Sequence, residues 1–214
     1  MIESGKLNRE DPDGEWLDGD RSDCSWDADR QGDYRRVSHP IMHVRAYEQR
    51  DGPALWELKE RFERELGALG GEEKSTDYDG KLTAEYRERY IEWVDRCNEC
   101  DPGCVLLAES EDEPSATNTE NEPVTSLAGY AFVLPADLSL IWDAAVLNEL
   151  YVREGDRGEG VADALLEGAL DHARGQDLPL DRIVLDVDGG NDRAGAFYRR
   201  HGFSNWGEMV AREL

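Results

Sequence analysis

A glycine-rich turn offers the clearest chemistry in this chain. The residues from Arg157 to Ala162 read Arg-Gly-Glu-Gly-Val-Ala, between a strand-like run ending at Val152 and a helical pattern beginning near Val161. Glycine lets the backbone approach a ligand closely, and the first N–H groups of a helix have no partner of their own. Those donors and the positive end of the helix dipole together bind anions. The turn therefore predicts a site for a phosphorylated ligand.

A second segment, about thirty residues later, carries an amide, a phenol and a further glycine. It runs from Asn191 to Phe203 and reads Asn-Asp-Arg-Ala-Gly-Ala-Phe-Tyr-Arg-Arg-His-Gly-Phe. Asn191 is suited to cap a helix, and Gly202 is suited to end one. A short strand-like run, Arg182 to Val187, separates the two segments. This order predicts strand, turn, helix, strand and helix.

Together the two segments resemble the GNAT superfamily of acyl-CoA-dependent N-acetyltransferases. Leu150 to Val152, four further residues and then Arg157 to Ala162 fit the family's R/Q-x-x-G-x-G/A turn, and residues 191–203 fit N-x-x-A-x-x-F-Y-x-x-x-G-F. The resemblance covers about residues 41 to 212. It implies an α/β fold with a mixed, mostly antiparallel sheet of six to seven strands. A parallel, splayed central pair and helices on both faces are part of that expectation.

The resemblance also implies acetyl-CoA as co-substrate, with no metal. The backbone of the turn would cradle the pyrophosphate, beside the permanent positive charge of Arg157. The strand before the turn would carry a bulge and part from the next parallel strand, so that its free backbone contacts the pantetheine arm and polarises the thioester carbonyl. The expected cofactor-binding residues are Leu150, Tyr151, Val152, Arg157, Gly158, Glu159, Gly160, Val161, Ala162, Asp163 and Asn191.

Two side chains are candidates for proton transfer. Tyr198 is the candidate general acid, because acyl transfer releases a thiolate whose conjugate thiol has a pKa near 8.5, and a phenol near pKa 10 is a suitable donor. The alternative is that Tyr198 only packs with Phe197 against the sheet. Glu149, just before Leu150, is the candidate base that takes the proton of the attacking amine. A substrate-orienting carboxylate at Glu149, with an ordered water or a remote residue as base, is the alternative.

The composition limits the other functions. The formal net charge is −25, and only four residues are lysine. A surface so acidic and so poor in lysine is similar to that of haloarchaeal cytosolic proteins, because self-repulsion is screened in strong salt. The sequence has no basic stripe that would bind nucleic acid. It also has no run of eighteen apolar residues, so it predicts no membrane span. We therefore expect a cytoplasmic, halophilic protein; a homodimer is left open.

The organisation predicted along the chain is an extension followed by one domain. Residues 1–39 are acidic, without steady periodicity, and are expected to be mostly disordered; residues 40–214 form the acetyltransferase-like domain. The expected strands cover residues 41–47, 104–108, 126–134, 144–152, 182–187 and 203–211. The first expected helix begins near residue 51, and three more cover residues 83–97, 158–174 and 192–201. Residues 109–123 are expected to form a solvated loop.

Three cysteines, Cys97, Cys100 and Cys104, are spaced C-x2-C-x3-C, and Cys24 lies far away. Zinc would need a fourth ligand, from Cys24 or a histidine. The simpler interpretation is a helix end with small buried thiols, since the second paired half of a zinc motif is missing. Metal binding by these cysteines is left open.

The leading functional hypothesis is transfer of an acetyl group from acetyl-CoA to a primary amine by direct attack in a ternary complex. The acceptor is open and includes small molecules and protein amines. The second hypothesis is a non-catalytic acyl-CoA-binding sensor or interaction module on the same fold, because fold does not fix function.

Overall fold

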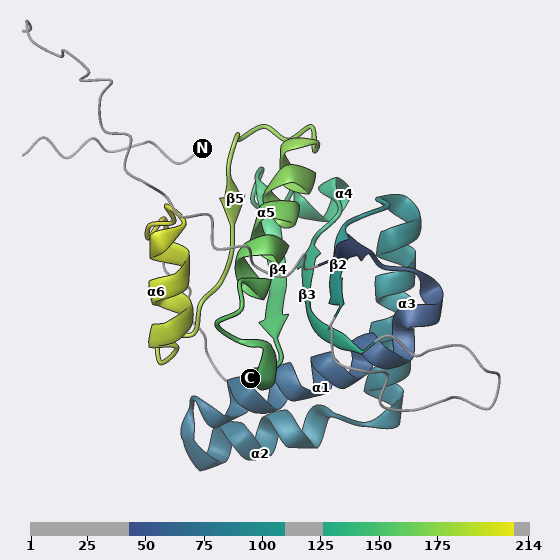
Figure 1. The fold of residues 1–214 in the computed structure, drawn as a ribbon, viewed down its shortest axis with the longest axis vertical. Helices are drawn as coiled ribbons and strands as arrows, with labels where there is room; N and C mark the ends of the chain where they lie inside the picture. The colour runs from purple at the N-terminus through teal and green to yellow at the C-terminus, as the bar shows by residue number, and fades with distance from the viewer. Residues whose placement is uncertain (1–42, 110–125, 208–214) are drawn as a thin grey trace, which may run out of the picture. The chain divides into compact units, whose positions relative to one another are not determined.

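A mixed β-sheet forms the centre of the fold. The computed structural model describes residues 43–109 and 126–207. Within them, five strands lie side by side in chain order (Figure 1). They are β1 (Val44–Ala46), β2 (Val105–Glu109), β3 (Leu127–Val133), β4 (Ala145–Val152) and β5 (Ile183–Val184). The first four pair antiparallel, and β5 pairs parallel with β4.

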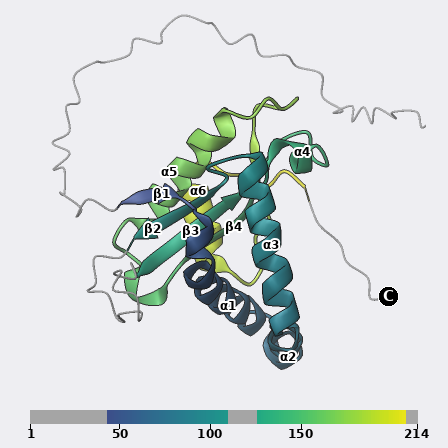
Figure 2. The ribbon, with the colours of Figure 1, turned by 90° about the vertical axis from the view of Figure 1, so that its right-hand side faces the viewer.

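Helices cover both faces of the sheet, as predicted, and each face has its own apolar core. The helices are α1 (Gly52–Ala68), α2 (Gly71–Lys81), α3 (Ala84–Cys100), the short α4 (Ala136–Ser139), α5 (Val161–Arg174) and α6 (Asp192–Arg200). One core joins α1 and α3 to the sheet, and the other joins α5 and the aromatic side chains of α6 to it. Figure 2 shows α1 and α3 on one side of the strands and α5 on the other. Because both faces are covered, every residue of β3 is buried.

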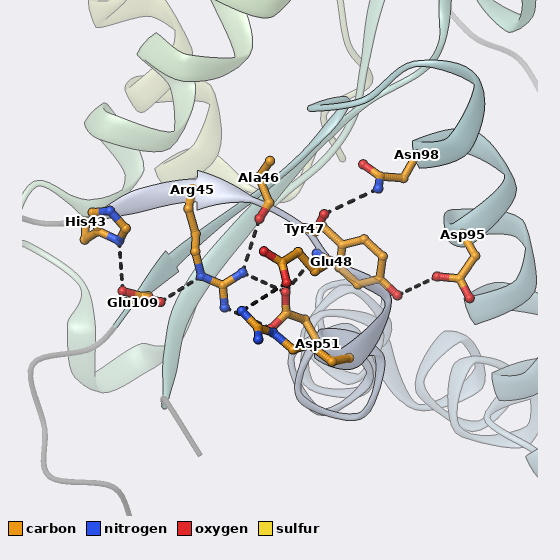
Figure 3. Close-up of polar contacts among 10 residues, drawn as sticks. His43, Arg45, Ala46, Tyr47, Glu48, Asp51, Asp95, Asn98 and Glu109 are labelled. Atoms are coloured by element: carbon orange, nitrogen blue, oxygen red, sulfur yellow. Dashed lines mark hydrogen bonds and ion pairs between the residues drawn. The ribbon is translucent and has the colours of Figure 1, made fainter. Parts of the chain in front are cut away.

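The start of α1 is fixed by ionic contacts with the edge strand. Asp51 stands at the N-cap position, and Pro53 follows in the first turn, where its missing N–H costs nothing. The Asp51 carboxylate accepts from the Glu48 N–H at 2.9 Å and from both terminal nitrogens of Arg45 at 2.7 and 2.8 Å (Figure 3). Arg45 Nε also donates to Glu109 at 2.7 Å. One guanidinium therefore ties β1 to β2 and to the beginning of α1.

Tyr47 makes the matching connection to α3. Its hydroxyl donates to Asp95 at 2.7 Å, and its backbone carbonyl accepts from the Asn98 side chain at 3.3 Å (Figure 3). Burial, together with Asp95, raises the pKa of Tyr47, so its phenol stays a donor. At the other end of α3, the Thr83 hydroxyl accepts from the Tyr86 N–H at 3.2 Å, which caps the helix where the sequence predicts its start.

Three predictions of the fold are corrected. The described residues form five strands, not six to seven, because residues 203–207 form no strand. The parallel pair β4–β5 consequently lies at one edge of the described sheet, not in its centre. The sequence did not predict helix α2, because this segment has almost no apolar residues and therefore no apolar stripe at helical spacing.

Several sequence expectations fall outside the described residues. These are the extension over residues 1–39 together with Cys24, almost the whole loop 109–123, and the end of the predicted last strand. Of the helices that the structure describes, none is long and apolar enough to cross a membrane.

Candidate functional site

The glycine turn has the conformation that its sequence predicts. Gly158 and Gly160 have φ angles of +90° and +85°, which glycine adopts without strain. Gly160 is the N-cap of α5, and a Cβ at either glycine would meet nothing within 4 Å. The first N–H groups of α5, from Val161 onward, have no carbonyl one turn earlier to bond to. The turn is therefore an open cradle of backbone donors at a helix N-terminus, which suits a phosphate.

A cavity of about 770 Å³ opens beside this turn. This volume lies within the range of about 300–1,000 Å³ that ligand sites occupy. Ten of the predicted site residues line it: Leu150, Tyr151, Val152, Arg157, Gly158, Gly160, Ala162, Asp163, Asn191 and Tyr198. Three others, Glu149, Glu159 and Val161, are not among the lining residues.

The cavity also has walls that the sequence did not reveal. Helix α1 contributes Phe62, Glu65 and Leu66, Leu69 just beyond its end also lines the cavity, and α6 contributes residues that include Arg193 and Arg200. Phe62 and Leu66 lie four residues apart, on the apolar stripe of α1. The spacing of apolar residues along a helix does not show whether their side chains pack on the sheet or line a cavity beside it.

Strand β4 has the bulge and the parting that the family resemblance implies. Phe132 lies opposite Glu149, but Val133 lies opposite Leu147, so Asn148 is the extra residue. On its other edge β4 pairs with β5 over only two rungs, which end at Val146. Among the described residues, no strand pairs with this edge of β4 beyond that point. The backbone of this edge from Asn148 to Tyr151 is thus available to the amides of an extended ligand, whereas the Val152 carbonyl accepts from Arg157.

Tyr198 presents a neutral phenol to the cavity. It packs on α6 against Phe197 and Phe203, with ring centroids 5.2 and 5.4 Å apart. Burial raises its pKa to about 12. A phenol that stays protonated to high pH is available to hydrogen-bond the sulfur while the thiolate leaves, and its raised pKa makes complete proton transfer to that thiolate uphill, because the conjugate thiol is the stronger acid.

Asn191 caps α6, as predicted, because its side-chain oxygen accepts from the Ala194 N–H at 3.0 Å. It also lines the cavity, so the capping role and a ligand contact coexist.

The guanidinium of Arg157 binds to groups of the protein itself. Its Nη2 donates to both carboxylate oxygens of Glu65, at 2.8 and 2.6 Å, and its Nε donates to the Val152 carbonyl at 2.8 Å. The guanidinium also lies 5.6 Å from the centre of the Tyr151 ring. Its positive charge is therefore largely balanced from within the protein.

Glu149 lies in the core between β4, α1 and α3, with only 7% of its surface exposed. Its carboxylate accepts from Lys59 at 2.7 Å, Tyr130 at 2.6 Å, Tyr90 at 2.9 Å and Asn148 at 3.2 Å. Burial, followed by the charge of Glu149, raises the pKa values of Tyr130 and Tyr90 well above their ordinary value.

Lys59 connects Glu149 to a second buried carboxylate. Its ammonium lies 2.7 Å from Glu149 and 2.6 Å from Glu63, and Glu63 also meets Lys81 at 2.6 Å. Burial alone would lower the pKa of Lys59, but the two carboxylates outweigh it and raise that pKa. Burial would likewise raise the pKa of Glu63, and the two lysines reverse this and lower it. We call Lys59, Glu63, Lys81 and Glu149 the buried ionic cluster.

Part of the acid around the glycine turn is balanced locally. The Asp156 carboxylate meets Arg153 at 2.6 Å. Asp163 accepts from Arg200 and His201, each at 2.9 Å, and although its burial acts the other way, these contacts lower its pKa. Glu154 and Glu159 remain exposed. Of these four carboxylates, Asp156 and Asp163 thus have a cationic partner close to the turn.

The cysteines in the described part of the chain are free thiols. Cys97 and Cys104 are buried and Cys100 is exposed. Burial raises the pKa of Cys97 and raises that of Cys104 to about 12, which makes both poor thiolates at neutral pH. Within residues 43–109 and 126–207, no group of three or more His, Cys, Asp or Glu side chains is placed to hold a metal.

The parted parallel pair, the glycine turn at a helix N-terminus and the cavity between them define an acyltransferase type of α/β fold. The chain belongs to the acetyltransferase (GNAT) family, whose model matches residues 68–203. The predicted family is thereby confirmed. No curated protein matches the chain.

Solved structures agree with this assignment at the level of the fold. PH1933 from Pyrococcus horikoshii is 20% identical with a TM-score of 0.52, over 79% of this chain and 92% of that one. A ribosomal-protein-alanine N-acetyltransferase from Brucella melitensis is 16% identical with a TM-score of 0.50, over 80% and 99%. A mutant Bacillus halodurans protein is 19% identical with a TM-score of 0.50, over 81% and 99%. At these identities the likeness shows the fold alone.

Proposed function

We propose that the protein is an N-acetyltransferase that moves the acetyl group of acetyl-CoA to a primary amine. The observation that carries the proposal is the cavity, in which the glycine cradle, the unpaired edge of β4 and Tyr198 all take part. The cradle would hold the pyrophosphate, the β4 edge would hold the pantetheine amides, and Tyr198 would face the sulfur.

The reaction we propose is a direct transfer. The amine nitrogen attacks the thioester carbonyl carbon, the C–S bond breaks, and the sulfur takes a proton from Tyr198. A backbone N–H at the β4 bulge would stabilise the negative charge that develops on the carbonyl oxygen. The phenol regains its proton from solvent after product release.

The proton of the attacking ammonium needs its own acceptor. Glu149 stays our candidate base, although Lys59 and two tyrosines already hold its carboxylate. An ordered water is the alternative acceptor. In either case the ammonium nitrogen loses two protons per turnover, one before attack and one from the tetrahedral intermediate, while the sulfur gains one through Tyr198, so that one proton is released to solvent.

A kinetic experiment tests this function. With purified protein, acetyl-CoA and a panel of amines, we expect release of free CoA thiol only when both substrates are present. Initial-rate lines that intersect on a double-reciprocal plot would support a ternary complex. Tight acetyl-CoA binding with no thiol release across a broad panel would instead support a non-catalytic acyl-CoA-binding module on the same fold.

The salt concentration in which the enzyme works, its cellular location and its oligomeric state are also proposals. The net charge of −25 supports a protein that works in concentrated salt. A cytoplasmic location and a homodimer are proposals that rest on the sequence alone.

The glycine cradle gives a prediction of its own. We expect Gly160→Ala to weaken acetyl-CoA binding by about tenfold or more, because a side chain at φ +85° costs roughly 1–2 kcal/mol and lies where phosphate would approach. Isothermal titration calorimetry measures the affinity. Gly155→Ala is the matched control, since Gly155 lies close by, lacks a positive φ and also faces open space. Equal affinities for the two variants would contradict the cradle.

A further inference from the structure

One carboxylate, that of Glu65, links three of the elements that surround the cavity. It projects from α1 and lines the cavity. It accepts from the Tyr151 hydroxyl of β4 at 2.7 Å and from Arg157 of the glycine turn at 2.6 and 2.8 Å. Arg193 of α6 lies 3.9 Å away. The helix on one face of the sheet is thus connected to the strand, the turn and the helix that would hold the cofactor.

The contact with Arg157 fixes the entry to the turn. Because Glu65 holds the Nη2 end of the guanidinium, the Nε end is directed at the Val152 carbonyl, the last residue of β4. Charge-assisted hydrogen bonds of this kind are shorter and stronger than neutral ones. The backbone of Val152 is therefore held at one side of the turn, and α5 holds the other side.

Tyr151 strengthens the same arrangement. Burial and then the hydrogen bond to Glu65 raise the pKa of Tyr151 to about 12, so its hydroxyl remains a donor. Phe62, one turn before Glu65, packs against the Tyr151 ring at 5.8 Å. Both contacts keep Glu65 over the end of β4.

The charge balance of the cavity argues in the same direction. Its lining carries three arginines and three acids: Arg157, Arg193, Arg200, Glu65, Asp163 and Asp192. Glu65 forms an ion pair with Arg157, and Asp163 forms one with Arg200. An anionic ligand therefore meets the backbone N–H groups of the turn and Arg193, which is largely exposed and 3.9 Å from Glu65, and the orientation of the turn matters for its binding.

We propose that Glu65 is a positioning residue that, through Arg157, holds the glycine turn in the orientation that binds the cofactor pyrophosphate. The inference rests on the proposed function for the identity of the ligand. Glu65 touches no reacting atom in this scheme. It acts on cofactor affinity, while the chemical step and the amine site are left to other residues.

Two measurements test the role of Glu65. First, we expect Glu65→Gln to raise the Kd for acetyl-CoA by about tenfold, the scale of losing one charge-assisted hydrogen bond. At saturating acetyl-CoA, kcat and the KM for the amine should change by less than about twofold, which separates positioning of the cofactor from a general loss of structure. The matched control is Glu60→Gln, because Glu60 lies on α1, pairs with Arg64 at 2.8 Å and does not line the cavity.

Second, hydrogen exchange of the ligand-free protein tests the clamp without any ligand. We expect the amides of residues 152–163 to exchange faster in Glu65→Gln than in the native chain or in Glu60→Gln. Unchanged exchange together with unchanged affinity would overturn the proposal, and so would tighter acetyl-CoA binding, since Glu65 would then compete with the phosphates. If the native chain failed to bind acetyl-CoA, the proposed function would fall, whereas the exchange experiment would still decide whether Glu65 holds the turn.

Discussion

The Tyr198→Phe variant is expected to lose about 100- to 10,000-fold in kcat, the range that one positioned proton donor contributes. The ring still fills its place against Phe197 and Phe203, so the fold and the acetyl-CoA affinity should change little. Only the hydroxyl of this cavity-lining residue is removed. Steady-state kinetics with a thiol-reactive dye measure the loss, and calorimetry measures the affinity.

The matched control is another tyrosine of the cavity. Tyr151→Phe removes a hydroxyl that donates to Glu65, so it should shift acetyl-CoA affinity and leave kcat within a few-fold. If Tyr151→Phe and Tyr198→Phe lowered kcat equally, the special role of Tyr198 at the sulfur would be lost.

The pH profile gives a second readout for Tyr198. Burial raises its pKa to about 12, and the acid form is the one that donates. Activity that depends on this proton is therefore present at lower pH and disappears only as the pH rises through that value. We expect no basic limb assignable to Tyr198 below about pH 11. A basic limb near pH 9 that vanished in Tyr198→Phe would show that the phenol titrates as if solvated.

The sequence predicted the conformation of the glycine turn well, because its signals are local. Gly158 and Gly160 adopt positive φ, as a glycine turn before a helix requires. Asn191 caps α6 three residues ahead of Ala194. Each of these features depends on residues close in the chain, and each one has a small set of allowed conformations.

The walls of the cavity could not be predicted in the same way. Glu65 reaches Arg157 across 92 positions of the chain, and Lys59 reaches Glu149 across 90. Charged residues of α1 read as a solvated face when the helix is considered alone. Which of them is buried depends on the strand that packs against α1, and a single sequence contains no direct signal of that pairing.

The contacts of Glu149 could not be predicted from the sequence either, because most of its partners are distant along the chain. Its place beside the β4 bulge follows from the family resemblance and is seen in the structure. Its partners, however, come from α1, α3 and β3 as well as β4. A candidate base chosen from its strand position alone carries no information about these donors.

The Lys59→Met variant is expected to destabilise the fold by about 3–5 kcal/mol, which is the cost of leaving a buried partner charge without its counter-ion. Lys59 is only 4% exposed, and its removal would deprive both Glu149 and Glu63 of the ammonium between them. For a chain of this size, each kcal/mol corresponds to about 2–4 °C in Tm. Chemical denaturation and thermal scans measure the change.

Arg64→Met is the matched control on the same helix. Arg64 pairs with Glu60 at 2.8 Å, but its side chain is more than half exposed. An exposed pair contributes about 0–1 kcal/mol. A loss in Arg64→Met as large as that in Lys59→Met would mean that burial is not the cause.

The buried ionic cluster should also make stability depend on pH. The pKa of Glu63 is lowered in the fold, so its stabilising effect is present above its ordinary value of 4.5 and is lost as the pH falls below that. The pKa of Lys59 is raised, so its effect is complete below its ordinary value of 10.5 and is lost as the pH rises above it. We expect this cluster to favour a stability plateau between those limits, and Lys59→Met to flatten it.

A double-mutant cycle separates an unpaired charge from a lost packing contact. In Lys59→Met with Glu149→Gln, one of the two orphaned carboxylates is neutral, while its amide can still accept from the hydroxyls of Tyr130 and Tyr90. Part of the loss should therefore be recovered, so that the double variant is more stable than the sum of the two single changes predicts. Strictly additive losses would show that Lys59 does not stabilise the fold through its ion pair with Glu149, but through its methylene chain or through the cation–π contacts of its ammonium with the Phe62 and Tyr90 rings, at 5.2 and 4.9 Å.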